Sequence, residues 1–239
     1  MKQIIQRILN ATIGHVLIWY PNTDISKRMK RLRYYNINNV LDIGANYGQY
    51  GTELRRHKYN GKITSFEPLE DAYKGLVQVS SNDNDWTANN FAIGNENGLG
   101  RINIAGNSHS SSIKNMNQAH IDSAPNSKYV DTQNIEIKTL DSIYDRYCEQ
   151  DDNVMMKVDT QGFEKEVVDG ALGCLKNVTL VQLELSLVPL YENEFLFIDM
   201  VMYMAEQGFR LIAIEDGFSN PKTGEQLQVD GVFANRISK

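Results

Sequence analysis

One segment of the chain, VLDIGANYGQYG at residues 40–51, restricts the possible folds more than any other. It begins with apolar strand formers, and a stretch that favours a helix starts at Tyr50. Between the two, Gly44, Asn46 and Gly48 stand at alternate positions. Glycine lets the backbone approach a ligand closely, and asparagine tolerates left-handed dihedral angles almost as well. A buried strand that turns sharply into a helix is typical of a nucleotide-binding crevice.

The spacing of this turn distinguishes between two kinds of nucleotide site. A dinucleotide-binding turn has the pattern G-x-G-x-x-G, whose third glycine would fall at Gln49. Here the pattern is G-x-N-x-G directly after Asp42, which resembles the first motif of S-adenosylmethionine-dependent methyltransferases. A second short strand, ITSF, leads to Glu67, 23 residues after Gly44. An acid that binds ribose hydroxyls is expected roughly 20 residues after such a turn. Alternatively, Glu67 is an ordinary surface acid before a proline.

Length and composition limit the kind of protein. The chain has 239 residues, 41% of them hydrophobic and 23% charged, which suits a single α/β domain with a substantial core. It has no run of 18 uninterrupted apolar residues, so we expect no transmembrane helix. Cys148 and Cys174 lack the spacing of a metal site, which favours reduced thiols in a cytoplasmic protein.

Residues 1–36 are expected to form a helical extension that precedes one domain at residues 37–239. Apolar residues between Ile4 and Leu17 follow helical spacing. The same stretch faintly resembles a secretion signal, but polar residues interrupt it and no small-residue cleavage site follows before Pro21. We therefore expect an amphipathic N-terminal helix.

Charge is distributed unevenly along the chain. Residues 1–35 carry a net charge of +6 and the remainder carries −12, for a total of −6. The densest basic cluster consists of Lys27, Arg28, Lys30, Arg31 and Arg33. Such a cluster is either a solvated helix face or a site for an anionic substrate or a membrane surface. The acidic remainder argues against a general nucleic-acid-binding protein.

Strand and helix patterns alternate after the opening segment and predict an α/β fold. We expect a mostly parallel, seven-stranded, Rossmann-like sheet with helices on both faces. No helix separates the last two strands, so the last strand should be antiparallel and insert between the fifth and sixth. The expected strands are 39–43, 62–66, 86–93, 154–158, 180–185, 209–214 and 226–234, and the expected helices are 49–57, 69–79, 141–148, 163–175 and 194–207.

Two features are expected between the third and fourth strands. Alternating residues at 101–104 and 135–140 predict a hairpin-like addition, and a long polar loop at 105–134 joins them. Asp141 is the expected N-cap of the helix that follows.

Ligands bind beyond the carboxyl ends of the strands in an open α/β sheet, so the residues that follow each strand are the site candidates. Backbone N–H groups are expected to hold the methionine part of the cofactor at Gly44, Ala45, Asn46 and Gly48. Glu67, with Pro68 beside it, would bind the ribose. Ala92 and Ile93 would flank the adenine ring or, alternatively, belong only to the strand core.

The fourth strand ends at Asp159, within the sequence MMKVDTQGFE. A carboxylate at this place can bind the cofactor amine, act as a general base toward a substrate hydroxyl, or ligate a metal. Lys157 points to the same side of the strand and would pair with it. Alternatively, Asp159 is the N-cap of the next helix.

Taken together, DIGANYG, SFEP, FAIG, NSHSSSI, TLDSI and KVDTQGFEKEVVDGA resemble the FkbM-type methyltransferase family over roughly residues 38–186. The resemblance implies a class I methyltransferase fold, S-adenosylmethionine as methyl donor, and O-methylation, often of sugar hydroxyls in glycans or of natural-product hydroxyls. By similarity, the residues that line the cofactor would be Asp42, Gly44, Asn46, Gly48 and Glu67, and Asp159 would lie where cofactor and substrate meet. The family often has Val-Glu-Gly where this chain has Thr160-Gln161-Gly162, so no role of that Glu carries over.

Three residues are candidates for the base that removes the acceptor's proton: Asp159, Glu184 at the end of the fifth strand, and His109 in NSHSSSI. Alternatively, His109 is simply solvated. Magnesium held by Asp159 and Glu184 is a further alternative, but no adjacent Asp-Asn pair supports it and we expect no metal.

We therefore expect methyl transfer to a hydroxyl of a sugar, glycan or glycolipid, as in polysaccharide biosynthesis. The alternatives are a natural-product hydroxyl or a non-catalytic scaffold that binds S-adenosylmethionine. A nicotinamide-dependent oxidoreductase is disfavoured, because the turn has the wrong spacing and no Tyr-x-x-x-Lys pair is present. The basic N-terminal segment points to an anionic acceptor or to peripheral membrane contact.

Overall fold

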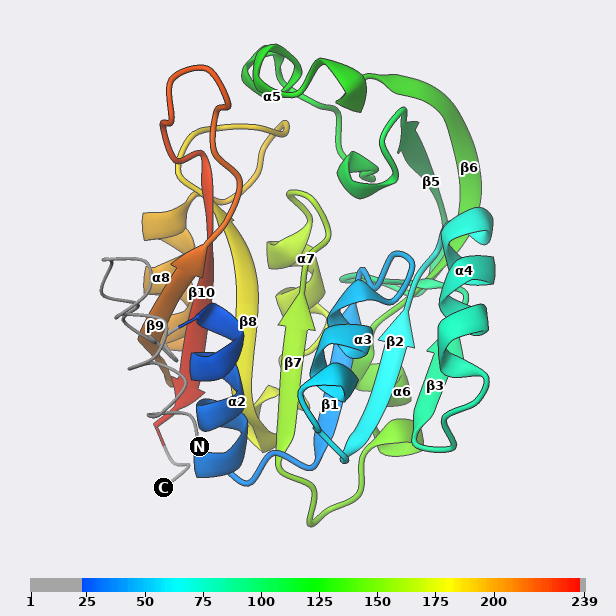
Figure 1. The fold of residues 1–239 in the computed structure, drawn as a ribbon, viewed down its shortest axis with the longest axis vertical. Coiled ribbons are helices and arrows are strands. Elements are labelled where there is room, and N and C mark those ends of the chain that lie inside the picture. Colours follow the sequence, from blue (N-terminus) through cyan, green and yellow to red (C-terminus); the bar gives the residue numbers. More distant parts are fainter. Residues whose placement is uncertain (1–22, 237–239) are drawn as a thin grey trace, which may run out of the picture.

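The computed structural model describes residues 23–236, which are built on a seven-stranded sheet (Figure 1). Its strands lie in the order β3 (Trp86–Asn89), β2 (Lys62–Phe66), β1 (Asn39–Ile43), β7 (Val154–Val158), β8 (Val178–Ser186), β10 (Gln228–Asn235) and β9 (Phe209–Asp216). The first five of these are parallel, whereas β10 is antiparallel to both of its neighbours. The predicted sheet, with an antiparallel last strand inserted between the fifth and sixth, is confirmed.

Helices cover both faces of the sheet because its central strands are apolar on both sides. All five residues of β1 and all five of β7 are buried. One face carries α2 (Asp24–Tyr34), α3 (Gln49–Arg56) and α4 (Glu70–Ser80), and the other carries α6 (Leu140–Tyr147), α7 (Glu164–Asp169) and α8 (Phe197–Glu206). None of the helices in residues 23–236 is long and apolar enough to cross a membrane.

A smaller sheet stands beside the main one. It consists of β4 (Ala92–Ile93), β6 (Tyr129–Lys138) and β5 (Gly98–Ala105), in that order. β5 and β6 are antiparallel, which agrees with the predicted hairpin-like addition. The predicted loop at 105–134 is wrong in part, because it contains η1 (Ser108–Ser110), α5 (Gln118–Ser123), η2 (Pro125–Ser127) and half of β6. Figure 1 shows α5 above the carboxyl ends of the main strands.

The prediction of one strand at 86–93 is wrong, because the chain changes sheets there. β3 ends at Asn89, opposite Phe66, the last residue of its partner β2. The side-chain amide of Asn90 then donates to the carbonyls of Glu67 and Pro68, at 2.9 and 3.1 Å. These bonds take the place of the next ladder bonds, and the chain continues as β4 in the smaller sheet.

Two helix predictions also need correction. Thr139, rather than Asp141, is the N-cap of α6, since its hydroxyl accepts from the N–H of Ser142. The carboxylate of Asp141 instead accepts the N–H groups of Gly173 and Cys174, at 2.9 and 2.8 Å. α7 ends at Asp169 and not at residue 175, and the next residue, Gly170, packs so closely that a Cβ on it would lie 1.9 Å from the carbonyl oxygen of Gly94.

The described part of the N-terminal extension packs onto the sheet. Met29 and Leu32 of α2 belong to the core cluster that contains Val40 and Ala234. On the same helix, Arg28 and Arg31 both pair with Glu215 of β9, which is 3% exposed. The amphipathic helix expected within residues 1–20 lies outside the described residues.

Candidate active site

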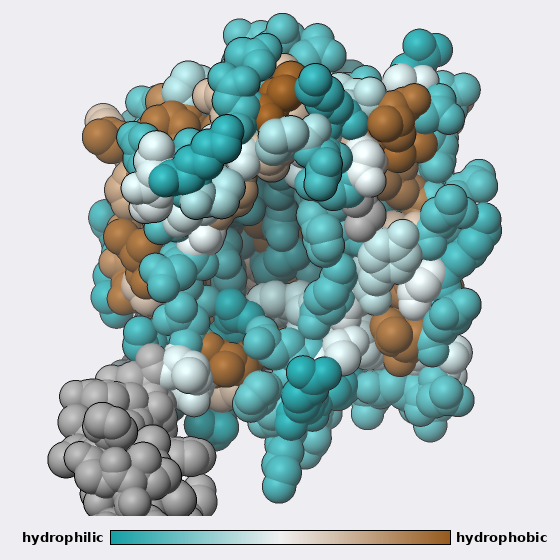
Figure 2. All heavy atoms as spheres, turned by 45° about the horizontal axis from the view of Figure 1, so that its top comes forward, coloured by the Kyte–Doolittle hydropathy of each residue, from teal (hydrophilic) through white to brown (hydrophobic). Residues whose placement is uncertain are grey.

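A cavity of about 760 Å³ opens at the carboxyl ends of the main strands. Figure 2 shows this face hollowed, with mainly hydrophilic residues around the hollow. The strand order reverses at β1, which lies between β2 and β7, and open α/β sheets bind ligands at such a point. The volume falls within the range of roughly 300–1,000 Å³ that small-molecule sites occupy.

The turn from β1 into α3 forms one wall of the cavity. Gly44, Asn46 and Gly48 have φ angles of 75°, 49° and 80°, the left-handed region that glycine and asparagine tolerate. A Cβ atom on Gly44 would lie 1.9 Å from the carbonyl oxygen of Asp159. The turn therefore passes directly against the end of β7, and only glycine fits there.

Internal hydrogen bonds engage the N–H groups of this turn. Gly44 and Ala45 both donate to the carbonyl of Phe66, at 3.0 and 3.1 Å, and Gly48 donates to Ala45. The N–H of Asn46 donates to Glu67 at 2.8 Å. Each of these groups thus has an acceptor within the protein, and the expectation that they hold a ligand stays a prediction.

The first turn of α3 supplies further backbone N–H groups as donors. A helix leaves its first N–H groups without intrahelical partners. Gln49 and Tyr50 begin α3 and line the cavity. This helix end can bind a carboxylate or another anion.

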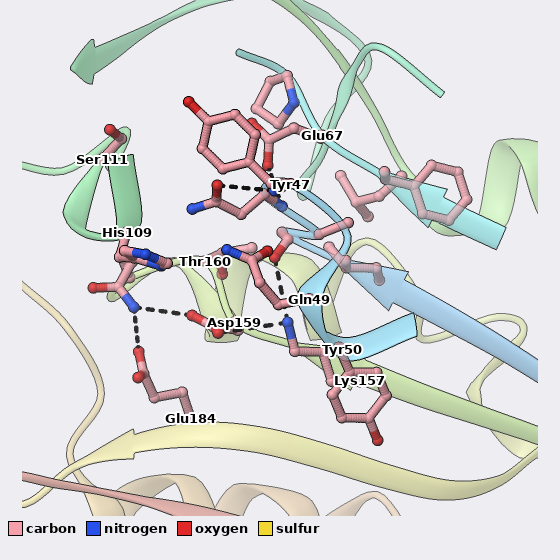
Figure 3. A pocket seen from close by; sticks show the side chains of 18 of the residues that line it. Tyr47, Gln49, Tyr50, Glu67, His109, Ser111, Lys157, Asp159, Thr160 and Glu184 are labelled. Atoms are coloured by element: carbon pink, nitrogen blue, oxygen red, sulfur yellow. Dashed lines mark hydrogen bonds and ion pairs between the residues drawn. The ribbon is translucent and has the colours of Figure 1, made fainter. Parts of the chain in front are cut away.

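Glu67 lies at the end of β2 and is 5% exposed (Figure 3). One carboxylate oxygen accepts the N–H of Asn46 and the other accepts the N–H of Leu69, both at 2.8 Å. Burial raises the pKa of Glu67 to about 7, although the two backbone donors act in the opposite direction. Glu67 is therefore a fixed acceptor in the cavity wall and not a surface acid.

A row of polar residues runs beneath the cavity across four strands. Ser65, Asp42, Lys157 and Gln182 are neighbours in register on β2, β1, β7 and β8. Ser65 donates to Asp42 at 3.2 Å, and the Lys157 ammonium lies 3.3 Å from the other carboxylate oxygen of Asp42. Asp42 is fully buried and does not line the cavity. It can therefore act on the cavity only through Lys157, which does line it.

Two carboxylates meet on the opposite side of the cavity. The Lys157 ammonium lies 3.5 Å from Asp159, as the sequence predicted. The side-chain amide of Gln161 donates to Asp159 at 2.9 Å and to Glu184 at 2.7 Å (Figure 3). Asp159 does not cap α7; the carboxylate of Glu164, the first residue of α7, instead accepts the N–H groups of Thr160 and Gly162 in the turn before the helix.

The acids around this point raise one another's pKa values. Removal from water is the largest cause for Glu184, whose pKa lies well above its usual range, and Asp159, Glu164 and Asp230 add to the shift. Burial, followed by Asp159, raises the pKa of Asp230 to about 6. Burial raises the pKa of Glu164 to about 7. This part of the cavity therefore holds protons more readily than isolated carboxylates do.

The structure brings most of the predicted site residues to one cavity. Those that line it are Gly44, Ala45, Asn46, Glu67, Pro68, Ala92, Ile93, His109, Asp159 and Glu184. Asp42 and Gly48 stand behind the wall. The further lining residues, which sequence reasoning did not place in the site, include Arg28, Tyr50, Gln161, Gln182 and Asp230. Gln161 had a visible signal in its departure from the family pattern, whereas the others depend on contacts between distant segments.

The basic cluster of α2 is divided between the interior and the surface. Arg28 pairs with Glu53 and Glu215, and Arg31 also pairs with Glu215. Lys30 and Arg33 are exposed. This helix is therefore neither a fully solvated face nor a free cationic site, because Arg28 and Arg31 are already paired with acids. Within residues 23–236, no group of three or more His, Cys, Asp or Glu is arranged to hold a metal ion.

Comparisons with known structures agree with this architecture. The methyltransferase FkbM from Methylobacillus flagellatus superposes with a TM-score of 0.50 at 12% identity, over 82% of this chain and 44% of that protein. This chain thus spans less than half of that protein's length. TehB from Haemophilus influenzae gives a TM-score of 0.48 at 9% identity, over 96% and 66% of the two chains. Precorrin-6y C5,15-methyltransferase from Geobacter metallireducens gives 0.46 at 13%, over 88% and 86%.

Comparison with functionally curated proteins finds no significant match. At these low identities the structural likeness shows the fold alone. The sequence itself matches the model described as "Methyltransferase FkbM domain" over residues 42–211. That stretch is most of the chain and extends from β1 to β9. The chain therefore belongs to the FkbM methyltransferase family.

Proposed function

We propose that this protein transfers a methyl group from S-adenosylmethionine to a hydroxyl group of a sugar, glycan or glycolipid. One observation carries the proposal. A single cavity has a buried ribose-type acceptor, Glu67, on one side and the paired carboxylates of Asp159 and Glu184 on the other. A nucleoside-bearing methyl donor and a hydroxyl acceptor would meet between them.

The cavity wall has the features that the methyl donor requires. The close approach at Gly44 brings the glycine turn against the end of β7 beside Asp159, and Glu67 retains lone pairs for two ribose hydroxyls. Ala92 and Ile93 supply an apolar slot for the adenine ring. The first turn of α3 would bind the methionine carboxylate, and Asp159 its ammonium group. When bound, the sulfonium group supplies an activated methyl group.

The acceptor side of the cavity is lined by hydrogen-bonding side chains. Glu184, Gln182 and Asp230 come from β8 and β10, and Tyr50 comes from α3. A polyhydroxylated acceptor matches such a wall better than an apolar one. Because the α2 arginines are paired with Glu215, we favour a neutral acceptor over the anionic one that the sequence suggested.

An alcohol is a weak nucleophile, so a base that accepts its proton assists transfer. Asp159 and Glu184 are the candidates whose carboxylates lie together, whereas His109 faces them from the η1 segment (Figure 3). The walls of the cavity align the hydroxyl with the methyl group, and such alignment contributes a large part of the rate. We further propose that the protein acts in the cytoplasm as one domain, residues 37–239, with its N-terminal extension.

Calorimetric titration with S-adenosylhomocysteine, with NAD as the control ligand, tests the cofactor. Micromolar binding of the first ligand alone supports the proposal. Binding of NAD alone would overturn it in favour of an oxidoreductase, and binding of neither would favour a non-catalytic scaffold. A screen of neutral glycans and natural-product alcohols with radiolabelled methyl donor then tests the acceptor. Asp159→Asn should lower turnover more than it lowers cofactor affinity, and equal turnover would remove Asp159 from the mechanism.

A further inference from the structure

The turn after β7 holds Gln161 in an unusual backbone conformation. Gln161 has a φ angle of 57° and is followed by Gly162 at 92°. Glu164 accepts the N–H of Thr160 at 2.8 Å and that of Gly162 at 3.3 Å, which closes the turn. The hydroxyl of Ser112 donates to the carbonyl of Gln161 at 2.7 Å. A non-glycine residue in the left-handed region persists only where its surroundings hold it, as they do here.

The side-chain amide of Gln161 has three partners. Its nitrogen lies 2.9 Å from Asp159 Oδ1 and 2.7 Å from Glu184 Oε2, and its oxygen accepts the hydroxyl of Tyr191 at 2.6 Å. In Figure 3 the dashed lines from Asp159 and Glu184 meet at this nitrogen. If the amide were reversed, its oxygen would face two carboxylates, so the neighbours determine its orientation.

Glu184 is surrounded mainly by groups of its own sign. Asp159 at the end of β7, Glu164 on α7 and Asp230 on β10 act against its negative charge, and Lys157 on β7 favours it. Tyr191, from the segment after β8, is neutral at ordinary pH because burial raises its pKa. The amide of Gln228 on β10 also donates to Glu184, at 3.0 Å. Gln161 is thus the donor that both Asp159 and Glu184 share.

We propose that Gln161 is a positioning residue whose amide holds the carboxylates of Asp159 and Glu184 side by side and favours the ionised form of Glu184 against the burial and like charges that favour its protonated form. This inference rests on the proposed function. The amide bridges the two carboxylates on one side of the cavity, where the Lys157 ammonium, 3.5 Å from Asp159, is the nearby positive charge. In the reaction, the hydroxyl O–H bond would break and its proton would pass to Glu184. The freed electron pair of the oxygen would form the new bond to the methyl carbon as the carbon–sulfur bond of the donor breaks, and that bond's electron pair would stay on sulfur, leaving S-adenosylhomocysteine.

The residue at position 161 then determines the charge state of the Glu184 carboxylate beside Asp159. A glutamate at position 161 would replace the shared donor with a third acceptor, which would either take up a proton or draw in a cation. An alanine would remove the donor and leave the two carboxylates to repel each other. Both changes favour the protonated form of Glu184, because each removes a hydrogen bond that stabilises the charged carboxylate.

Carboxyl titration by ¹³C NMR tests this inference without a substrate. The protein is labelled at glutamate Cδ, and Glu184→Gln assigns the Glu184 signal. Gln161→Ala should raise the pKa of Glu184 by about one unit, equivalent to about 1.4 kcal/mol. Gln161→Glu should raise it further. Gln118→Glu is the matched control, because Gln118 also donates to a carboxylate, that of Asp122 at 2.7 Å, but on an exposed helix. It should leave Glu184 unchanged.

Tyr191→Phe gives a milder variant should the others fail to fold. It removes the hydroxyl that anchors the amide oxygen, so we expect a smaller shift of Glu184 in the same direction. An unchanged Glu184 titration in every folded Gln161 and Tyr191 variant would overturn the inference. The titration is independent of ligand binding. A wild-type protein that binds no S-adenosylhomocysteine would refute the proposed function, while the Glu184 shifts would still decide the role of Gln161.

Discussion

Affinity for the cofactor should depend on the protonation state of Glu67. Its carboxylate is 5% exposed, and each of its oxygens already accepts one backbone N–H. Burial raises its pKa to about 7. The ionised group keeps lone pairs for two ribose hydroxyls, whereas a proton on it occupies one of those positions. Affinity for S-adenosylhomocysteine should therefore rise with pH and level off above 7, and at pH 6 it should be about tenfold weaker than at the plateau.

The substitution Glu67→Gln separates the effect of the carboxylate's charge from the effect of the side chain's shape. The amide has the size of the carboxylate, but its NH₂ group would face the N–H of either Asn46 or Leu69. Loss of hydrogen bonds to a charged acceptor costs about 1.5–3 kcal/mol, so affinity should fall roughly 10- to 150-fold and lose its pH dependence. Calorimetric titration from pH 5.5 to 8.5 at constant ionic strength measures both effects. Glu70→Gln, an exposed neighbour, is the control and should behave as wild type.

Stability gives a second measurement on the same residue, without a ligand. Because the pKa of Glu67 is raised on folding from 4.5 to about 7, its contribution is fully present below pH 4.5 and is lost as pH rises through 7, by about 3 kcal/mol at most. The stability of the wild type relative to Glu67→Gln should therefore fall between pH 5 and pH 8. A flat difference in unfolding free energy, together with pH-independent ligand affinity in the wild type, would refute this account of Glu67.

Three further predictions concern the frame of the site. Gly44→Ala should abolish ligand binding and lower the thermal midpoint, because its Cβ would lie 1.9 Å from the carbonyl of Asp159; a variant with wild-type affinity would contradict the geometry. Glu215→Leu should destabilise the fold by about 3–5 kcal/mol in denaturant unfolding, since it leaves two arginines of α2 without their buried partner. Burial lowers the pKa of His120 to about 4, so its contribution to stability is lost as pH falls from 6.5 toward 4. His120→Phe should therefore lose less stability than wild type between pH 7 and pH 5, and equal losses would count against this assignment.

Local pattern was enough to predict the elements that carry the site. Short strands rich in apolar residues and followed by turns gave β1, β2 and β7 with correct bounds, because strands buried on both faces are mainly apolar. The same pattern could not show where β3 ends. The residues after it, NFAI, read as a strand in either sheet, and the choice depends on the partner β6, some 40 residues away.

The features that the sequence did not predict are those that depend on contacts between distant segments. Arg28 reads as one of five exposed basic residues, and only its pairing with Glu215 shows that it is buried. Asp141 and Thr139 are both good capping residues, and the partners of Asp141 lie more than 30 residues away. The acceptors of the turn's N–H groups could not be predicted either, since the carbonyl of Phe66, which accepts from Gly44 and Ala45, comes from the neighbouring strand.

Asp42 illustrates how a motif residue can act without touching the ligand. It is fully buried beneath the turn, where the ammonium group of Lys157 lies 3.3 Å away. The same ammonium group lies 3.3 Å from the carbonyl of Gly44 and 3.5 Å from Asp159. Burial alone would lower the pKa of Lys157, but Asp159 and Asp42 outweigh it and raise the pKa. Lys157 therefore stays charged and ties the glycine turn to the carboxylate opposite it. Asp42 balances that charge from below, which explains how an acid just before the turn can act on the cavity through Lys157 without lining it.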